Sequence, residues 1–345
     1  MHTAPSDDKI NNCYNPVAIF QVLLGIIAVT VAASEYAGLF APRPQFSVFI
    51  IHTKYFFWLS VTAAATTLFR VVMILRKNRS ISLLLLQIAI LLICSAVWLS
   101  RATHFEGKSI RLEGQSMGGL PGDYLRPTLY STNIKTPNMG FSLLKLTPVA
   151  GNNPAKLARV RADILLASIS SPVNRELSFS SSFPLFTAGT IVRITDFGYA
   201  PRFSMSTLGG QQIDSDYQYL KLFPAGSEDS FVPFTYGYTI ALRLWPDYQN
   251  IAGKPTTRSF ELKNPVFKVR IVRNKDIVYN DYMKLGEKLK FDSSVFQLYD
   301  PVMWAEFTMI SDAGIYPLAT GMVLLAISGI MAIYYKRKDS LSTAA

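Results

Sequence analysis

Cysteine and histidine are scarce in this chain of 345 residues, which contains two cysteines and three histidines. Cys13 precedes the first long apolar run and Cys94 lies inside the third, so the two thiols are not predicted to meet. This arrangement excludes a disulfide framework, a thiol redox pair and the CxxCH motif that attaches haem covalently. The chain is therefore not itself a c-type cytochrome.

Motifs that mark common enzyme classes are also missing. The sequence contains neither the HExxH motif of zinc proteases nor a glycine-rich phosphate loop. Asp214 and Asp216, in the stretch QQIDSDYQ, are candidates for cation binding. An isolated pair lacks the roughly six to eight oxygens that Ca²⁺ prefers, which favours a solvated turn. The sequence thus indicates no ordinary active site.

Four windows, at residues 17–34, 55–75, 81–100 and 315–335, are almost free of charge. Each approaches the roughly 20 residues that a helix needs to cross the hydrocarbon layer. Arg70 lies near one end of the second window, where its side chain can reach the membrane surface. The first window lacks a clear cleavage site, so it is interpreted as a retained helix rather than a signal peptide. We therefore predict four transmembrane helices.

The positions of lysine and arginine set the orientation of these helices. Basic residues gather in two short flanks. The flank after the second window contains Arg76, Lys77 and Arg79, and the flank after the fourth window contains Lys336, Arg337 and Lys338. The loop 36–54 has only Arg43 and Lys54. Because basic flanks stay inside, both termini are predicted to be cytoplasmic, in a bacterial-type inner membrane, with residues 101–314 outside.

The net charge of +11 gives no reason to propose nucleic-acid binding. The exported segment has 24 basic and 19 acidic residues, and the remaining charge lies mostly in the membrane flanks. A basic stripe or patch of the kind that follows a phosphate backbone is not indicated. The membrane lipid bilayer is therefore the partner that the charge pattern predicts.

The exported segment is predicted to be rich in strands. Alternating or β-branched runs such as GTIVRITDFGY and FTYGYTIALRLW are separated by turn-rich pieces such as AGNNPAK and PDYQNIAGKP. This spacing favours an antiparallel β-sandwich or a related two-sheet domain, as one large domain or two small ones. The expected fold class is an integral membrane α-helical protein with a large extracytoplasmic, mainly antiparallel β domain. The expected organisation is a tail at 1–16, three helices within 17–100, the β domain at 101–314, a fourth helix at 315–335 and a tail at 336–345.

Two histidines lie at the predicted outer membrane surface. His52 directly precedes the second window, and His104 follows the end of the third. Imidazole is a common ligand of haem iron, so this pair is a candidate for cofactor binding. Amphipathic rings also favour the membrane interface without any ligand, and the residues alone favour that interpretation.

The chain resembles the ResB (also CcsB) proteins of system II cytochrome c biogenesis. The resemblance extends from about residue 17 to about residue 338 and depends on the order of several local motifs. These are IIHTKYFFWLSVTAAATTLFR before and within the second span, FEGKSIRLEGQ after the third, FPLFTAGTIVRITDFGYAPRFSM, and ISDAGIYPLATGMVLLAISGIM at the last span. Two departures stand out: Gln87 replaces a histidine that family members often carry, and Ala313 replaces the proline of Asp-Pro-Gly.

The resemblance implies a non-catalytic assembly factor that handles haem b, transient or bound. Such a factor acts with a CcsA-type membrane protein to deliver haem to exported apocytochrome c. The chain has four scattered tryptophans, so the tryptophan-rich haem-handling loop would come from the partner. The loss of a histidine at Gln87 leaves His52 and His104 as the candidate ligands, and of these only His52 lies in a family-like motif.

Two other functions remain open. The chain can be a non-catalytic structural or accessory subunit of a membrane respiratory or multihaem cytochrome complex, which the scarcity of histidine favours. A membrane-anchored sensor is the weaker alternative, because the predicted cytoplasmic tails are too short to signal.

Overall fold

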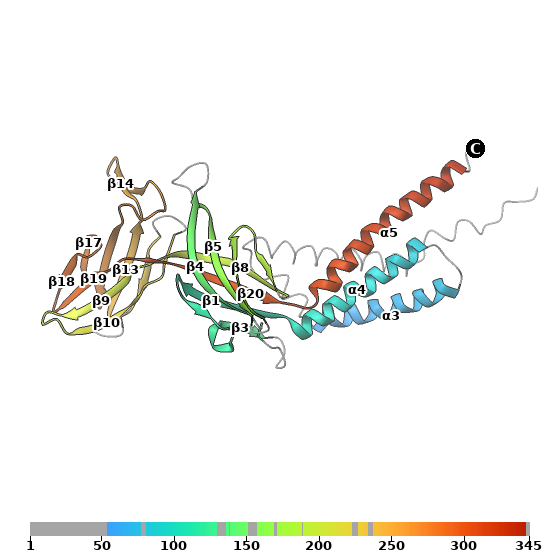
Figure 1. Ribbon diagram of the computed structural model, residues 1–345, viewed down its shortest axis with the longest axis horizontal. Coiled ribbons are helices and arrows are strands. Elements are labelled where there is room, and N and C mark those ends of the chain that lie inside the picture. The colour runs from blue at the N-terminus through green and yellow to red at the C-terminus, as the bar shows by residue number, and fades with distance from the viewer. Residues whose placement is uncertain are drawn as a thin grey trace, which may run out of the picture. The chain divides into compact units, whose positions relative to one another are not determined.

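A computed structural model describes residues 54–76, 81–129, 136–137, 139–150, 157–168, 171–187, 189–222, 227–233 and 237–342 (Figure 1). The chain divides into two compact units. The helical unit contains Met1–Phe105, Thr128–Lys135 and Ser311–Ala345, and the β unit contains Glu106–Pro127 and Thr136–Ile310. His52 and the predicted span at 17–34 lie outside the described residues.

The described part of the helical unit contains three helices. They are α3 (Lys54–Arg76), α4 (Ile81–Thr103) and α5 (Ile315–Ser342). Leu and Ala, which favour helix, recur along α4 and α5, and neither helix contains an acidic residue in its first turn. Among the described residues, Ile81–Thr103 and Ile315–Tyr335 are long and apolar enough to cross a membrane.

The prediction of four membrane-spanning helices is therefore not supported by the described residues. The predicted span at 55–75 does form a helix, α3, but its apolar stretch is limited to Ser60–Ile74. Threonines and Arg70 lower the hydropathy of this segment. The hydroxyl groups of Thr66 and Thr67 donate to the backbone carbonyl of Ala63, one turn earlier. Those bonds let α3 carry polar side chains without unsatisfied groups.

Helices α4 and α5 pack closely because small residues face each other. A Cβ atom at Gly321 of α5 would lie 2.9 Å from Ile93 Cγ1 and 3.0 Å from the Ala89 carbonyl oxygen of α4. Farther along the pair, Ser82 donates a 3.0 Å hydrogen bond to the carbonyl of Ser328. Small residues and side-chain hydrogen bonds of this kind stabilise helix pairs in a bilayer.

The β unit consists mostly of antiparallel sheets. Its first sheet has the order β11 (Leu220–Lys221), β8 (Thr190–Ala200), β20 (Val302–Ser311), β1 (Phe105–Leu112) and β3 (Leu125–Leu129), with β7 (Leu185–Thr187) also paired to β8. Its second sheet has the order β2 (Ser116–Met117), β4 (Met139–Ala150), β5 (Leu157–Ser168) and β6 (Ser171–Ser180). A short 3₁₀ helix, Pro121–Asp123, precedes β3.

Three further sheets follow in the described residues. One has the order β10 (Gln212–Tyr217), β9 (Arg202–Thr207), β19 (Ser294–Leu298) and β18 (Lys288–Phe291). The next has the order β12 (Asp229–Phe231), β13 (Tyr238–Trp245), β16 (Val266–Arg273) and β17 (Asp276–Lys284). Strands β14 (Tyr248–Ile251) and β15 (Lys254–Thr257) form a hairpin. A mainly antiparallel β domain was predicted, and it is confirmed.

Aromatic side chains join the sheets in pairs. Phe307 of β20 contacts Phe141 of β4 edge to face, with 5.0 Å between ring centroids, and so packs the first sheet on the second. Phe203 of β9 lies 4.8 Å from Phe231 of β12, which packs the third sheet on the fourth. Edge-to-face and tilted ring pairs add stability beyond the area that they bury. In the described residues, an aromatic pair therefore links the first sheet to the second, and another links the third to the fourth.

Candidate functional site

A buried polar cluster joins the end of α4 to the start of α5. The Asp312 carboxylate accepts a 2.6 Å hydrogen bond from Ser100 Oγ, and the same Oδ2 atom lies 3.1 Å from Nδ1 of His104. The other oxygen, Oδ1, accepts a 2.7 Å bond from the backbone N–H of Gly314. All three side chains of this cluster, Ser100, His104 and Asp312, are buried. We call them the interhelix cluster.

Local backbone geometry explains why these residues meet. The N–H of His104 donates to the Ser100 carbonyl at 2.8 Å, so His104 continues the last turn of α4. Asp312 lies just before α5, where the free N–H groups of a helix start favour a carboxylate. Gly314 permits the close approach, because a Cβ atom there would fall 2.4 Å from the Ala96 carbonyl oxygen.

A second contact joins the same two helix ends. The backbone N–H of Ala313 donates a 3.1 Å hydrogen bond to Thr103 Oγ1, and that hydroxyl in turn donates to the Leu99 carbonyl at 2.7 Å. A proline at position 313 would have no N–H to donate. This hydrogen bond thus adds a second link between the end of α4 and the start of α5.

The haem-ligand role of His104 stays a prediction, and the structure shows the surroundings of its two ring nitrogens. A carboxylate at Nδ1 is the usual support of a metal-binding histidine, and Asp312 supplies it. The opposite atom, Nε2, is buried. Among the described residues, no group of three or more His, Cys, Asp and Glu side chains could hold a metal ion. The other ligand candidate, His52, lies outside the described part of the chain.

Asp214 and Asp216 lie on strand β10, not on a turn as predicted. Their spacing of two residues places both side chains on one face of the strand. Asp214 is half-buried, whereas Asp216 is exposed and accepts a hydrogen bond from the N–H of Tyr217. The DxD pattern is therefore explained by a polar strand face.

The pentapeptide GQSMG, at residues 114–118, fits the Gly-x-Ser-x-Gly pattern of serine hydrolases. In those enzymes the serine lies on a sharp turn between a strand and a helix, next to a histidine. Here Ser116 belongs to the two-residue strand β2, and its hydroxyl is 2.7 Å from the hydroxyl of Ser142. No histidine occurs in the sequence after His104, so the β unit does not supply the histidine that those enzymes use as a base.

Charged side chains connect three strands of the first sheet. Glu306 of β20 accepts hydrogen bonds from Lys108 Nζ of β1 at 2.9 Å and from Thr195 Oγ1 of β8 at 2.7 Å. Burial alone would raise the pKa of Glu306, but these hydrogen bonds and the charges of Lys108 and Lys221 outweigh it and lower that pKa. Lys108 therefore has a structural partner in the sheet.

The sequence pointed to His104 but missed the two residues that hold it. Ser100 and Asp312 are more than two hundred positions apart, and only folding brings them together. A signal was present: Asp312 is a carboxylate next to an apolar window, and such residues in membrane proteins are expected to find a partner. No protein-family model matches this chain, and no curated protein matches it, so the ResB resemblance depends on the quoted motifs and the order of the elements.

Proposed function

We propose that this chain is a membrane-anchored, ResB-like scaffold subunit of cytochrome c assembly. In this proposal four helices, at 17–34, 55–75, 81–100 and 315–335, lie in a bacterial-type inner membrane with both termini in the cytoplasm. The β domain faces outward and receives exported apocytochrome c. A CcsA-type partner supplies the haem-handling chemistry, and haem is the cargo of the complex.

One observation supports the scaffold role above others. The β unit is inserted in the chain between α4 and α5. Strands β1 and β20, which follow α4 and precede α5 in the chain, are neighbours in one sheet. The helix ends themselves are joined by Ser100, His104 and Asp312. Helix ends joined by buried hydrogen bonds, and an inserted β unit whose first and last strands are neighbours, support a scaffold role for the chain.

The test is deletion of the gene followed by measurement of covalent haem. Cells that lack the chain should accumulate apocytochrome c and lose the pyridine haemochrome signal of c-type haem. Expression of the full chain from a plasmid should restore that signal. Normal maturation in the deletion strain would contradict the proposal.

An accessory subunit of a respiratory or multihaem cytochrome complex is the second candidate. The covered Nε2 atom of His104 and the glutamine at position 87 favour it, because a scaffold that has lost haem ligands can keep its shape. This alternative predicts copurification with mature cytochromes at a fixed ratio and no effect of deletion on haem attachment. Copurification from cells that contain the chain and haem attachment in the deletion strain therefore distinguish the two candidate functions.

A further inference from the structure

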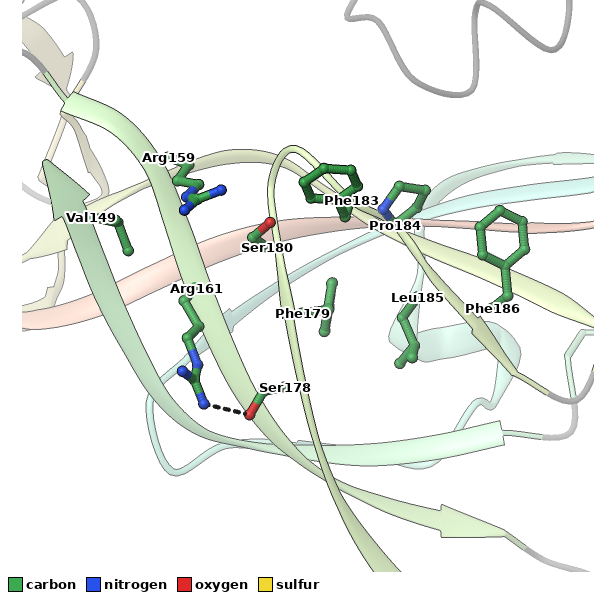
Figure 2. Close-up of a pocket in the computed structure, with 10 residues that line it drawn as sticks. All are labelled: Val149, Arg159, Arg161, Ser178, Phe179, Ser180, Phe183, Pro184, Leu185 and Phe186. Atoms are coloured by element: carbon green, nitrogen blue, oxygen red, sulfur yellow. Dashed lines mark hydrogen bonds between the residues drawn. The ribbon is translucent and has the colours of Figure 1, made fainter. Parts of the chain in front are cut away.

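A groove of about 690 Å³ lies on the solvent-facing side of the second sheet (Figure 2). Its floor comes from β5 and β6, where Arg161 pairs in register with Ser180, and from Arg159 on the same face. Its wall comes from β7 and the turn before it, which present Phe183 and Phe186. The groove thus combines two guanidinium groups with two aromatic rings.

The two arginines of the groove differ in their partners. Arg161 donates to Asp163 Oδ1 at 3.1 Å and to Ser178 Oγ at 3.0 Å, as Figure 2 shows for the serine. The hydrogen bond from Ser178, and then the charge and hydrogen bond of Arg161, lower the pKa of Asp163, so that carboxylate stays ionised near neutral pH. Arg159 is exposed, and no described residue forms an ion pair or hydrogen bond with its side chain. The groove therefore has one cation that is free to bind an anion.

The aromatic wall is unusually exposed for large apolar side chains. Phe183 is 66% exposed and Phe186 is 55% exposed, whereas the neighbouring Phe179 is buried against Phe307. Covering a phenylalanine side chain contributes about 1.5–3 kcal/mol. Exposed aromatic rings beside an arginine are characteristic of binding surfaces.

We propose that this groove binds an extended polypeptide segment that carries one carboxylate beside an aromatic or aliphatic side chain. The carboxylate pairs with the Arg159 guanidinium, which can donate two parallel hydrogen bonds. The apolar side chain covers Phe183 and Phe186. A second carboxylate near Arg161 is disfavoured, because the ionised Asp163 already occupies that guanidinium.

The charge pattern favours a polypeptide over a lipid surface. Adsorption to anionic lipid depends on several basic residues, each of which contributes about 1 kcal/mol. The groove offers one unpaired cation, and Asp163 lies on the same face of the strand. A peptide needs only the single charge and the apolar contact. This inference does not depend on the proposed role in cytochrome assembly.

The experiment uses the full chain in detergent and fluorescein-labelled peptides. The probe is Ser-Gly-Glu-Gly-Phe-Gly-Ser with blocked ends, and the matched peptides replace its Glu by Gln or its Phe by Ala. We expect saturable binding of the probe and roughly tenfold or greater weakening for each matched peptide, as expected for loss of a charge-assisted hydrogen bond or a buried ring. Fluorescence anisotropy measures all three affinities.

Two arginine variants complete the experiment. Arg159→Gln should abolish the preference for Glu over Gln in the peptide. Arg258→Gln removes the same charge from another exposed position of the β unit and should keep the preference. Absence of saturable binding, equal binding of the Glu and Gln peptides, or an unchanged preference in R159Q would each overturn the proposal. Binding of the chain to phosphatidylglycerol vesicles would also overturn it, if the peptide did not displace the vesicles and the R159Q variant no longer bound them.

Discussion

Ser100 Oγ and Asp312 Oδ2, which are 2.6 Å apart, form a buried hydrogen bond between the last turn of α4 and the residues that start α5. The bond joins the two helices at the points where the chain leaves and re-enters the helical unit. Its acceptor is a carboxylate, and hydrogen bonds to charged groups contribute about 1.5–3 kcal/mol each. The interhelix cluster is thus the structural core of this end of the helical unit.

Removing the carboxylate of Asp312 should destabilise the helical unit. Asp312→Ala leaves Ser100, His104 and the Gly314 N–H without their acceptor, which should cost about 2–4 kcal/mol. Thermal unfolding in detergent, followed by helical circular dichroism, measures the loss. Asp300→Ala removes an exposed carboxylate and is the control. Equal melting temperatures for the two variants would show that the cluster contributes nothing.

The contact between Ala313 and Thr103 can be isolated by a double-mutant cycle. Ala313→Pro removes the N–H that donates to Thr103 Oγ1, and Thr103→Val removes the acceptor. We expect a coupling energy of about 1 kcal/mol, the usual contribution of one neutral hydrogen bond. The measurement is the free energy of unfolding of the wild type, both single variants and the double variant. Strict additivity would mean that the hydrogen bond does not stabilise the helix ends.

Two glycines of α5 should respond in opposite ways to the same substitution. Gly321→Ala places a Cβ atom within 3.0 Å of Ile93 Cγ1 and the Ala89 carbonyl, so it should separate α4 from α5 at a cost of about 1–3 kcal/mol. Gly329→Ala meets nothing within 4 Å and should be neutral or stabilising by up to about 1 kcal/mol, because alanine favours helix. Thermal unfolding of both variants in the same detergent is the measurement. Loss of stability in Gly329→Ala alone would contradict this packing.

The sequence predicted the types of element well and their long-range contacts poorly. Alternating runs such as GTIVRITDFGY became strand β8, because a period of two is a local property. From the sequence alone, the stretch Tyr282–Lys290 (YMKLGEKLK) fits a short helix and a hairpin equally well. It contains the end of β17 and the start of β18, which pair with β16 and β19 in different sheets, and Gly286 makes the turn between them at positive φ. No local sequence pattern shows that the chain passes from one sheet to another between β17 and β18.

The candidate site shows the same limit. His104 was visible because histidine is rare, but its burial depends on Asp312 at the far end of the exported segment. The arginines and phenylalanines of the groove were not singled out, because they become neighbours only when β5, β6 and β7 fold. Strand alternation could have placed Arg159 and Arg161 on one face, but not the aromatic wall beside them.

The haem hypothesis makes different predictions for the two histidines. If His52 ligates haem, His52→Ala should abolish the Soret absorbance of the purified complex at unchanged protein level. His104→Ala should leave that absorbance unchanged and lower the melting temperature, because His104 already pairs with Asp312 inside the interhelix cluster. Absorbance spectra and melting curves of both variants give the answer. Loss of the Soret band in His104→Ala at equal stability would assign the ligand to His104.

The ion pair between Glu306 and Lys108 should make the β unit sensitive to acid. The pKa of Glu306 is lowered in the folded state, so the stability that it contributes is present above its unfolded value and lost as pH falls through the folded value. The free energy of unfolding should therefore begin to fall below about pH 4.5. The expected loss is about 0.5–1 kcal/mol, because Lys108 is 44% exposed and water screens the ion pair. Lys108→Met should reduce this loss, whereas Lys254→Met, at an exposed position in β15, should not. Urea unfolding followed by tryptophan fluorescence at neutral pH and at pH ~4 measures the difference. An identical acid dependence in both variants would show that solvent screens the pair completely.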